Sequence, residues 1–279
     1  CSRMRAVFLV LLGLALAHYI FRSSFSFSAA PENSQRIVGG SVTTITQYPF
    51  SAVLMYPVVG SPLTYYQACG GTILNNRSIL SAANCFLLVN NLIYIHSRYC
   101  IFSTRYASCD GVIMHPNYYY VIQDSDVAIL RVSPGIGFNN NVRAGQIAGP
   151  NYNLADNQPV WAIGWGNTAA GGFRSEQLRH VQIWTVNQAI CRQRFALGGY
   201  TLTDNMLCAG WLDVGGRDQC GGDGGSPLLH NNVVIGVCSW GRGCASDFYP
   251  GVNTRVSLLD RPFIGKGRKG RKLSSRKNK

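Results

Sequence analysis

Three short segments contain the residues whose types and spacing could do chemistry. They read C-G-G-D-G-G-S-P-L over 220–228, S-A-A-N-C over 81–85 and D-S-D-V-A-I-L over 124–130. Nucleophilic attack on a carbonyl requires an activated hydroxyl or thiol, an adjacent base and a group that orients the base. Asp126 supplies a carboxylate, but Gly224 has no side-chain oxygen and the amide of Asn84 is not a base. As written, these segments hold an acid without an activated nucleophile or a base.

All three segments resemble the catalytic motifs of the trypsin-like serine proteases. The nucleophile loop of that family reads C-x-G-D-S-G-G-P-L, which places Gly224 where the attacking serine belongs and Ser226 where a glycine belongs. The second segment resembles the motif T-A-A-H-C, with Asn84 in the place of the general-base histidine, and the third makes Asp126 the acid of the catalytic triad. We expect Ser226 not to replace the missing nucleophile, because it lies two positions along a tight Gly-rich turn and attack geometry is demanding.

The resemblance extends from Arg36 to about Ser257. It is carried also by Q-A-C-G-G-T-I-L over 67–74, W-A-I-G-W-G over 161–166, S-W-G over 239–241 and P-G-V over 250–252. The stretches 151–157 and 175–181 are similar to those of lepidopteran midgut trypsins. The family has an all-β fold of two six-stranded antiparallel β-barrels, with the active site in the cleft between them, and this is the fold that the resemblance implies.

The distribution of apolar residues independently predicts an all-β chain. Short apolar runs alternate with Gly, Asn and Pro, which is the pattern of many β-strands joined by turns. Only the stretch 187–195 suggests a helix. The clearest strand predictions are 51–56, 71–74, 127–132, 160–163 and 233–237.

The resemblance also implies a pocket for an Arg or Lys side chain. Asp218, two residues before Cys220, takes the position at the base of this pocket, and Gly241 and Gly251 leave its walls open. Ser239 and Trp240 belong to the same substrate-binding stretch. The oxyanion hole of the family is built from backbone N–H groups, here those of Gly222 and Gly224, and these donors do not need a side chain at residue 224.

The N-terminal residues predict a secreted precursor. Met4-Arg5, which we take as the true start, is followed by an apolar run over 6–17, so that 1–17 reads as a signal peptide and 18–36 as a propeptide. The sequence R-I-V-G-G over 36–40 resembles the family's activation site. It implies that a trypsin-like protease cleaves after Arg36 and that the new ammonium group of Ile37 then pairs with Asp223. The protease-like domain is predicted to span 37–260.

The ten cysteines, together with the signal peptide, indicate an oxidising compartment and a disulfide framework. For Cys100 and Cys109, a local bridge and two free thiols both remain open, and Cys238 is expected to be a buried, hydrophobe-like residue. No C-x-x-C or H-x-x-x-H spacing occurs, so neither a zinc site nor another cofactor is predicted. Family resemblance pairs Cys69 with Cys85, Cys191 with Cys208, and Cys220 with Cys244.

The net charge of +13 is concentrated at the ends of the chain. Residues 261–279 contain nine Lys or Arg and no acid, whereas 37–260 contain twelve Arg, no Lys and eleven acids. We interpret 261–279 as a basic tail, disordered or artefactual, and predict no nucleic-acid or membrane partner and a monomeric chain. The histidines outside the motif are expected to be ordinary surface or turn residues: His96, His115, His180 and His230.

The sequence therefore predicts a trypsin-like serine protease homologue, secreted into a gut lumen, that is catalytically inactive and binds basic peptides or protease inhibitors through its Arg/Lys pocket. A second interpretation is an active digestive trypsin, an endopeptidase that cleaves after Arg or Lys, misrepresented here by errors in the sequence or gene model. The loss of two triad residues within readable motifs favours the first interpretation, and the abrupt change of composition after Ser257 favours the second.

Overall fold

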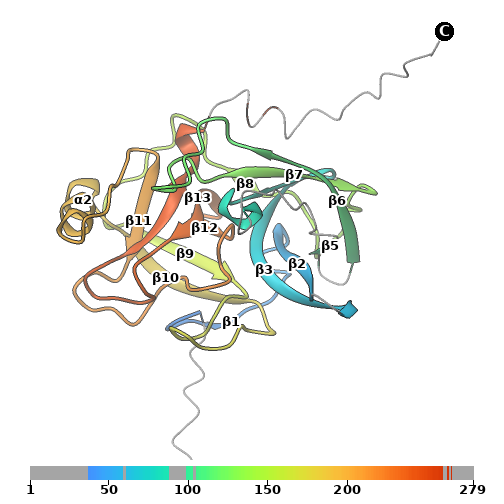
Figure 1. Cartoon of the computed structure of the whole chain (residues 1–279), viewed down its shortest axis with the longest axis horizontal. Coiled ribbons are helices and arrows are strands. Elements are labelled where there is room, and N and C mark those ends of the chain that lie inside the picture. The colour runs from blue at the N-terminus through green and yellow to red at the C-terminus, as the bar shows by residue number, and fades with distance from the viewer. Residues whose placement is uncertain are drawn as a thin grey trace, which may run out of the picture. The chain divides into compact units, whose positions relative to one another are not determined.

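The computed structural model describes residues 37–58, 61–87, 99–102, 105–259, 263 and 265. These residues fold into two β-barrels that lie side by side (Figure 1). The predicted signal peptide, the predicted propeptide and most of the basic tail lie outside the described residues. Within the described part, no helix has the length and apolarity needed to span a membrane.

The first barrel is a closed ring of six antiparallel strands in the order β2-β3-β4-β7-β6-β5. Its inner face is filled by branched aliphatic side chains, and each residue of the short strand β4 is buried. The β-branched residues of these strands suit a pleated, buried surface. The strands are β2 (Ser51–Val58), β3 (Ser61–Asn75), β4 (Ser78–Ser81), β5 (Tyr99–Phe102), β6 (Arg105–Met114) and β7 (Ala128–Ser133).

The second barrel contains six antiparallel strands whose pairings also close a ring, because β9 pairs with both β12 and β10. The remaining pairings run β12-β13-β14-β11-β10, and β1 and β8 join the sheet from outside this ring. Its strands are β9 (Pro159–Gly164), β10 (Arg179–Thr185), β11 (Met206–Gly210), β12 (Pro227–His230), β13 (Val233–Trp240) and β14 (Gly251–Arg255), with β1 (Ser41–Val42) and β8 (Gln146–Ile147) added. The predicted fold of two six-stranded antiparallel barrels is confirmed, as are all five strand predictions.

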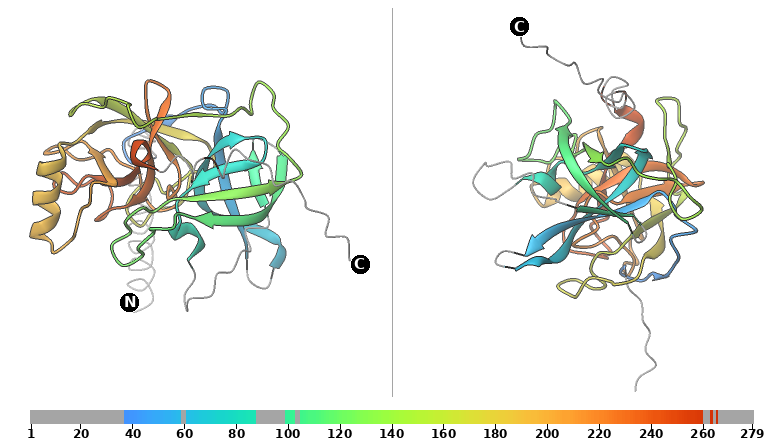
Figure 2. Two further views of the ribbon diagram at one scale, coloured as in Figure 1. Left: turned by 90° about the horizontal axis from the view of Figure 1, so that it is seen from above. Right: turned by 90° about the vertical axis from the view of Figure 1, so that its right-hand side faces the viewer.

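One α-helix, α2 (Gln188–Leu197), packs at the outer end of the second barrel (Figures 1 and 2). Asn187 begins it as the N-cap, since its Oδ1 accepts hydrogen bonds from the N–H groups of Ala189 and Ile190 at 2.9 and 3.1 Å. The helix therefore starts where the sequence suggested. Two 3₁₀ turns, η1 (Asn84–Phe86) and η2 (Val256–Leu258), complete the described elements.

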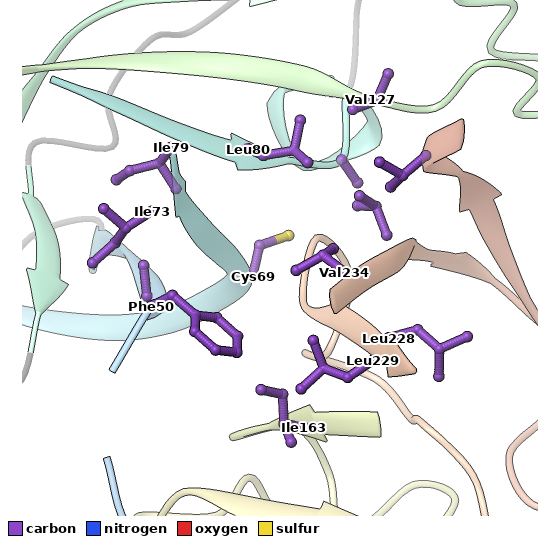
Figure 3. Close-up of a cluster of buried hydrophobic side chains, with 14 of the residues drawn as sticks. Phe50, Cys69, Ile73, Ile79, Leu80, Val127, Ile163, Leu228, Leu229 and Val234 are labelled. Atoms are coloured by element: carbon purple, nitrogen blue, oxygen red, sulfur yellow. The ribbon is translucent and has the colours of Figure 1, made fainter. Parts of the chain in front are cut away.

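Side chains from both barrels meet in one continuous apolar core (Figure 3). Phe50, Ile73 and Leu80 approach from the first barrel, while Ile163 and Leu228 approach from the second. Each barrel covers one side of this shared core. Loops from both barrels therefore meet at the boundary between the barrels. The candidate site is built from these loops.

One described residue beyond the predicted boundary at Asp260 packs into the core. Phe263 is only 2% exposed and belongs to the core, with its ring centroid 4.9 Å from that of His115. His115 is itself buried, so it is not a surface residue, but it begins a turn, because its backbone oxygen accepts the N–H of Tyr118 at 3.0 Å. The composition of the tail concealed this contact, because one apolar residue among many cations gives no recognisable pattern.

Candidate active site

The nucleophile-like loop, residues 220–228, is anchored at both ends in the second barrel. The disulfide Cys220–Cys244 holds its start, and β12 continues from Pro227. Between them, Gly222 and Gly225 have φ values of +93° and +82°, which L-residues with side chains rarely adopt. Gly225 also lies against the first barrel: a Cβ atom there would stand 2.2 Å from Oγ of Ser81. The glycines thus allow a tight turn between the barrels.

Gly224 faces the first barrel at the place where the family carries its serine. A Cβ atom at 224 would meet only ordinary contacts, 3.6 Å from Sγ of Cys69 and 3.8 Å from Oδ1 of Asn84. A serine would therefore fit at this position beside residue 84. As the sequence stands, no side-chain oxygen projects from Gly224 towards Asn84.

Ser226 cannot serve as a substitute nucleophile. Its Oγ points into the protein, where it would lie 1.9 Å from a Cβ added to Gly70 and 3.0 Å from one added to Gly164. The residue is 2% exposed and does not line the pocket. The register of the loop, which places the hydroxyl two residues past Gly224, therefore turns it away from the cleft.

Asn84, at the position predicted for the general base, donates two hydrogen bonds from its side-chain amide. Its Nδ2 donates to Oε1 of Gln123 and to the backbone oxygen of Ser239, each at 3.0 Å. Both hydrogens of the amide are thus directed to acceptors, one in the loop between β6 and β7 of the same barrel and one in β13 of the second barrel. An amide held in this way can orient neighbouring groups, but it has no basic lone pair with which to accept a proton.

Asp126 is completely buried behind Asn84. Its Oδ1 accepts the N–H of Asn84 at 2.7 Å and its Oδ2 accepts the hydroxyl of Ser239 at 2.5 Å. Burial raises the pKa of Asp126 to about 6, while the hydrogen bonds from Ser239, Asn84 and Ala83 act in the opposite direction. The acid is therefore held by the same backbone and side-chain donors whether or not an imidazole stands in front of it.

A cavity of about 300 Å³ opens beside Gly224. Asp218 lies at its buried end, 4% exposed, and accepts the N–H groups of Gln219 and Ala245 at 2.8 and 3.0 Å. Burial raises the pKa of this carboxyl group to about 7. Gly251 must lack a side chain, because a Cβ atom there would stand 2.6 Å from Oδ1 of Asp218.

The cavity brings together the residues that were predicted from separate parts of the sequence. Its lining contains every member of the predicted substrate-binding and oxyanion sets: Asp218, Ser239, Trp240, Gly241, Gly251, Gly222 and Gly224. No backbone acceptor in the described part of the chain takes a hydrogen bond from the N–H of Gly222 or Gly224. These donors are therefore available to a ligand oxygen. Within the same part, no cluster of His, Cys, Asp and Glu could hold a metal ion.

Two of the three predicted activation residues, Ile37 and Asp223, lie next to residues that contact or line this pocket. Ile37 is fully buried, and Val38 forms a β-bridge with Asp218. Asp223 is also fully buried, accepting the N–H groups of Gly166 and Cys220 at 2.8 and 3.0 Å, and burial raises its pKa to about 7. Arg36 lies outside the described residues.

Among the residues that the structure describes there are three disulfides, and they are the three pairs that the resemblance implies. They join Cys69 to Cys85, Cys191 to Cys208, and Cys220 to Cys244. Cys238 is a buried thiol that lines the pocket, as expected for a hydrophobe-like cysteine, and burial raises its pKa well above the usual value. The side chain of Cys100 lies outside those described, so the possible bridge to Cys109 stays a prediction.

The comparisons with known proteins agree with this architecture. The trypsin family model matches residues 37–261. The chain belongs to the trypsin family. It is 58% identical to Trypsin CFT-1 of Choristoneura fumiferana over 83% of this chain and 91% of that protein. It is 53% identical to Trypsin, alkaline C of Manduca sexta over 90% of this chain and 95% of that protein. The predicted similarity to lepidopteran trypsins is confirmed, and this chain is a trypsin-like serine protease homologue.

One residue beside the pocket escaped the sequence reasoning. Arg174 is exposed, yet its Nε would lie 3.0 Å from a Cβ atom at Gly222. No motif signals it, because its position depends on a loop that folds back from β9.

Two of the remaining histidines are partly exposed and each shares one hydrogen bond with a tyrosine. Nδ1 of His180 lies 2.8 Å from the hydroxyl oxygen of Tyr48, and Nδ1 of His230 lies 2.8 Å from that of Tyr152. His96 lies outside the described residues.

Proposed function

We propose that this chain is a secreted member of the trypsin family that binds Arg- or Lys-bearing peptides, or inhibitors that present such a side chain, without hydrolysing them. One observation carries the proposal: Gly224 and Asn84 leave no nucleophile and no base at the reaction centre, while the pocket that ends at Asp218 is complete. Loss of either triad residue in a protease of this mechanism costs about a millionfold in turnover, and loss of both costs little more.

The retained pocket can recognise a cation without any catalytic group. A carboxylate at the buried end of a narrow cavity attracts a guanidinium or amidinium through charge-assisted hydrogen bonds. Each carboxylate oxygen of Asp218 accepts one hydrogen bond from a backbone N–H group, so each oxygen keeps a lone pair for a ligand. A bound peptide would direct its carbonyl oxygen towards the N–H groups of Gly222 and Gly224 and remain intact.

Activation is part of the proposal. The β-branched Ile37 has φ +43°, which is an outlier for such a residue. Cleavage after Arg36 would give Ile37 a free ammonium group and release its φ angle from the preceding peptide bond. Pairing of that group with the buried carboxylate of Asp223 would place a full positive charge beside a carboxyl group that two backbone N–H groups hold in the uncleaved chain.

The test uses protein cleaved after Arg36 and then freed of the activating protease. We expect no hydrolysis of Arg-amide substrates and no labelling by a fluorophosphonate, but binding of benzamidine by calorimetry. Stoichiometric labelling at Ser226, or turnover at a trypsin-like rate, would refute the inactive assignment. Absence of benzamidine binding to a folded, cleaved sample would refute the binding role.

A second candidate is an active digestive trypsin of the gut lumen, and the comparisons favour it. The relatives named above are trypsins, they cover almost the whole domain, and the space at Gly224 accepts a serine without displacement of its neighbours. The three disulfides fit an extracellular compartment under either function. Resequencing the transcript across codons 84, 224 and 257 decides between the two: His and Ser codons would establish the active enzyme.

A further inference from the structure

The surface next to Gly222 borders the pocket that ends at Asp218. Gly222 belongs to the pocket lining, and its N–H is one of the two oxyanion donors. A ligand whose Arg side chain fills the pocket has its carbonyl oxygen at these donors. The residues that follow that carbonyl in the ligand must therefore pass over Gly222 and towards whatever lies beyond it.

Arg174 lies beyond it. Its Nε and Cζ would stand 3.0 and 3.4 Å from a Cβ atom at Gly222, so the guanidinium covers the space that glycine leaves free. The same guanidinium lies 6.0 Å from the ring centroid of Tyr66, a residue of β3 that is 47% exposed. Arg174 thus lies between Gly222, which lines the pocket, and Tyr66 of the first barrel.

The loop that carries Arg174 is fixed to the nucleophile-like loop. Asn167 and Arg174 form a β-bridge that closes the hairpin 167–174, and the N–H of Asn167 donates to the backbone oxygen of Gly221 at 2.7 Å. At the other end, the N–H of Ser175 donates to the backbone oxygens of Trp165 and Gly166 at 3.1 and 3.2 Å. Arg174 is therefore positioned by backbone bonds relative to Gly222.

The guanidinium has no ion-pair partner within the described residues. Burial lowers the pKa of Arg174, while Tyr66 and Asp223 raise it. Asp223 is fully buried and engaged by two backbone donors, so it does not reach the surface to occupy the guanidinium. An arginine remains charged at any working pH and offers a planar, multiple donor that suits a carboxylate.

We propose that Arg174 forms a carboxylate subsite, which favours ligands carrying Asp or Glu one or two residues after the Arg or Lys that enters the pocket. This inference rests on the proposed binding function and adds the sequence preference of the ligand. Successive residues of an extended peptide are about 3.3 Å apart. One or two residues after the anchored carbonyl therefore suffice to reach the guanidinium.

The test uses two fluorescent peptides with the same flanking sequence, one containing Arg-Ala-Asp and the other Arg-Ala-Asn. Fluorescence anisotropy measures the affinity of each peptide for the full chain cleaved after Arg36. Partly exposed ion pairs are weak, so we expect the Asp peptide to bind about two- to fivefold more tightly at low salt. The preference should disappear in Arg174→Gln and shrink as salt rises.

The matched control is Arg242→Gln, which removes an exposed arginine from the Gly241–Gly243 side of the same pocket. It should keep the Asp preference. Equal binding of both peptides to the unchanged protein, or an equal loss of preference in both variants, would overturn the subsite. If neither peptide nor benzamidine bound, the proposed function itself would fail, which is a different outcome.

Discussion

Oδ1 of Asn84 lies 3.8 Å from the point where a Cβ atom of residue 224 would stand. The two positions of the missing base and missing nucleophile therefore face each other across the cleft at a separation that side chains can bridge. Asp126 remains behind Asn84, with its two oxygens held by Asn84 and Ser239. Under the proposed function, the acid and its supporting hydrogen bonds are retained while the nucleophile and the base are absent.

This geometry predicts how activity can be restored. Gly224→Ser should fold normally, because its Cβ makes no contact shorter than 3.6 Å, but should remain nearly inactive without a base. Gly224→Ser combined with Asn84→His should hydrolyse Arg-amide substrates about 10⁵- to 10⁶-fold faster than the single variant, since nucleophile and base act as a unit. Initial rates on both proteins, cleaved after Arg36, provide the measurement. Near-full activity of the single variant would show that another base acts there.

Ligand binding to the pocket should depend on pH through Asp218. Burial raises the pKa of this carboxyl to about 7, so the group is largely neutral below that pH in the empty pocket. A cationic ligand binds the carboxylate, and its affinity should therefore increase as pH rises from about 5 to 7 and level off above about 8. Calorimetry with benzamidine measures the profile. Asp218→Ser should remove both the binding and its pH dependence while far-ultraviolet circular dichroism stays unchanged.

The stability of the uncleaved chain should fall as pH rises from about 4 to 7. Burial raises the pKa of Asp126 to about 6 and those of Asp218 and Asp223 to about 7, whereas the carboxyl group of an unfolded aspartate has a pKa of about 4. Between these values the native state holds more protons than the unfolded state, so the free energy of unfolding decreases with pH. Urea midpoints at several pH values test this.

Cleavage after Arg36 offers a control for the same experiment. If the ammonium group of Ile37 pairs with Asp223, the pKa of that carboxyl falls and its share of the pH dependence is lost. The cleaved protein should therefore show a shallower decline of stability than the uncleaved one. Identical slopes for the two forms would contradict the proposed pairing.

Much of the fold could be predicted because it depends on local signals. The apolar runs that became β2, β7 and β13 are readable one strand at a time, and Asn187 is a recognisable helix N-cap. The family motifs fixed the pocket in the same way, since each of its residues lies in a short, specific stretch. Local pattern was enough wherever the role of a residue is decided by its immediate neighbours in the chain.

The rest could not be predicted because it depends on contacts between distant segments. Arg174 matters only because the hairpin 167–174 bonds to Gly221, and nothing in its own sequence indicates that neighbour. The bonds of Asn84 likewise join distant segments, because Gln123 follows β6 in the same barrel and Ser239 belongs to β13 of the other barrel. The tail was predicted from composition, which cannot identify a single residue that packs into the core.

That residue, Phe263, leads to the last prediction. It is 2% exposed and packs edge-on against the buried His115, so Phe263→Ala should destabilise the protein by about 3–5 kcal/mol, the usual cost of removing a buried phenylalanine. Leu258→Ala is the matched control, because Leu258 lies five residues earlier and is 52% exposed, and it should cost well below that amount. Chemical denaturation of the two variants under identical conditions gives the comparison. If both changes had the same small effect, the chain after Asp260 would contribute nothing to the core, and the composition-based interpretation of the tail would be correct.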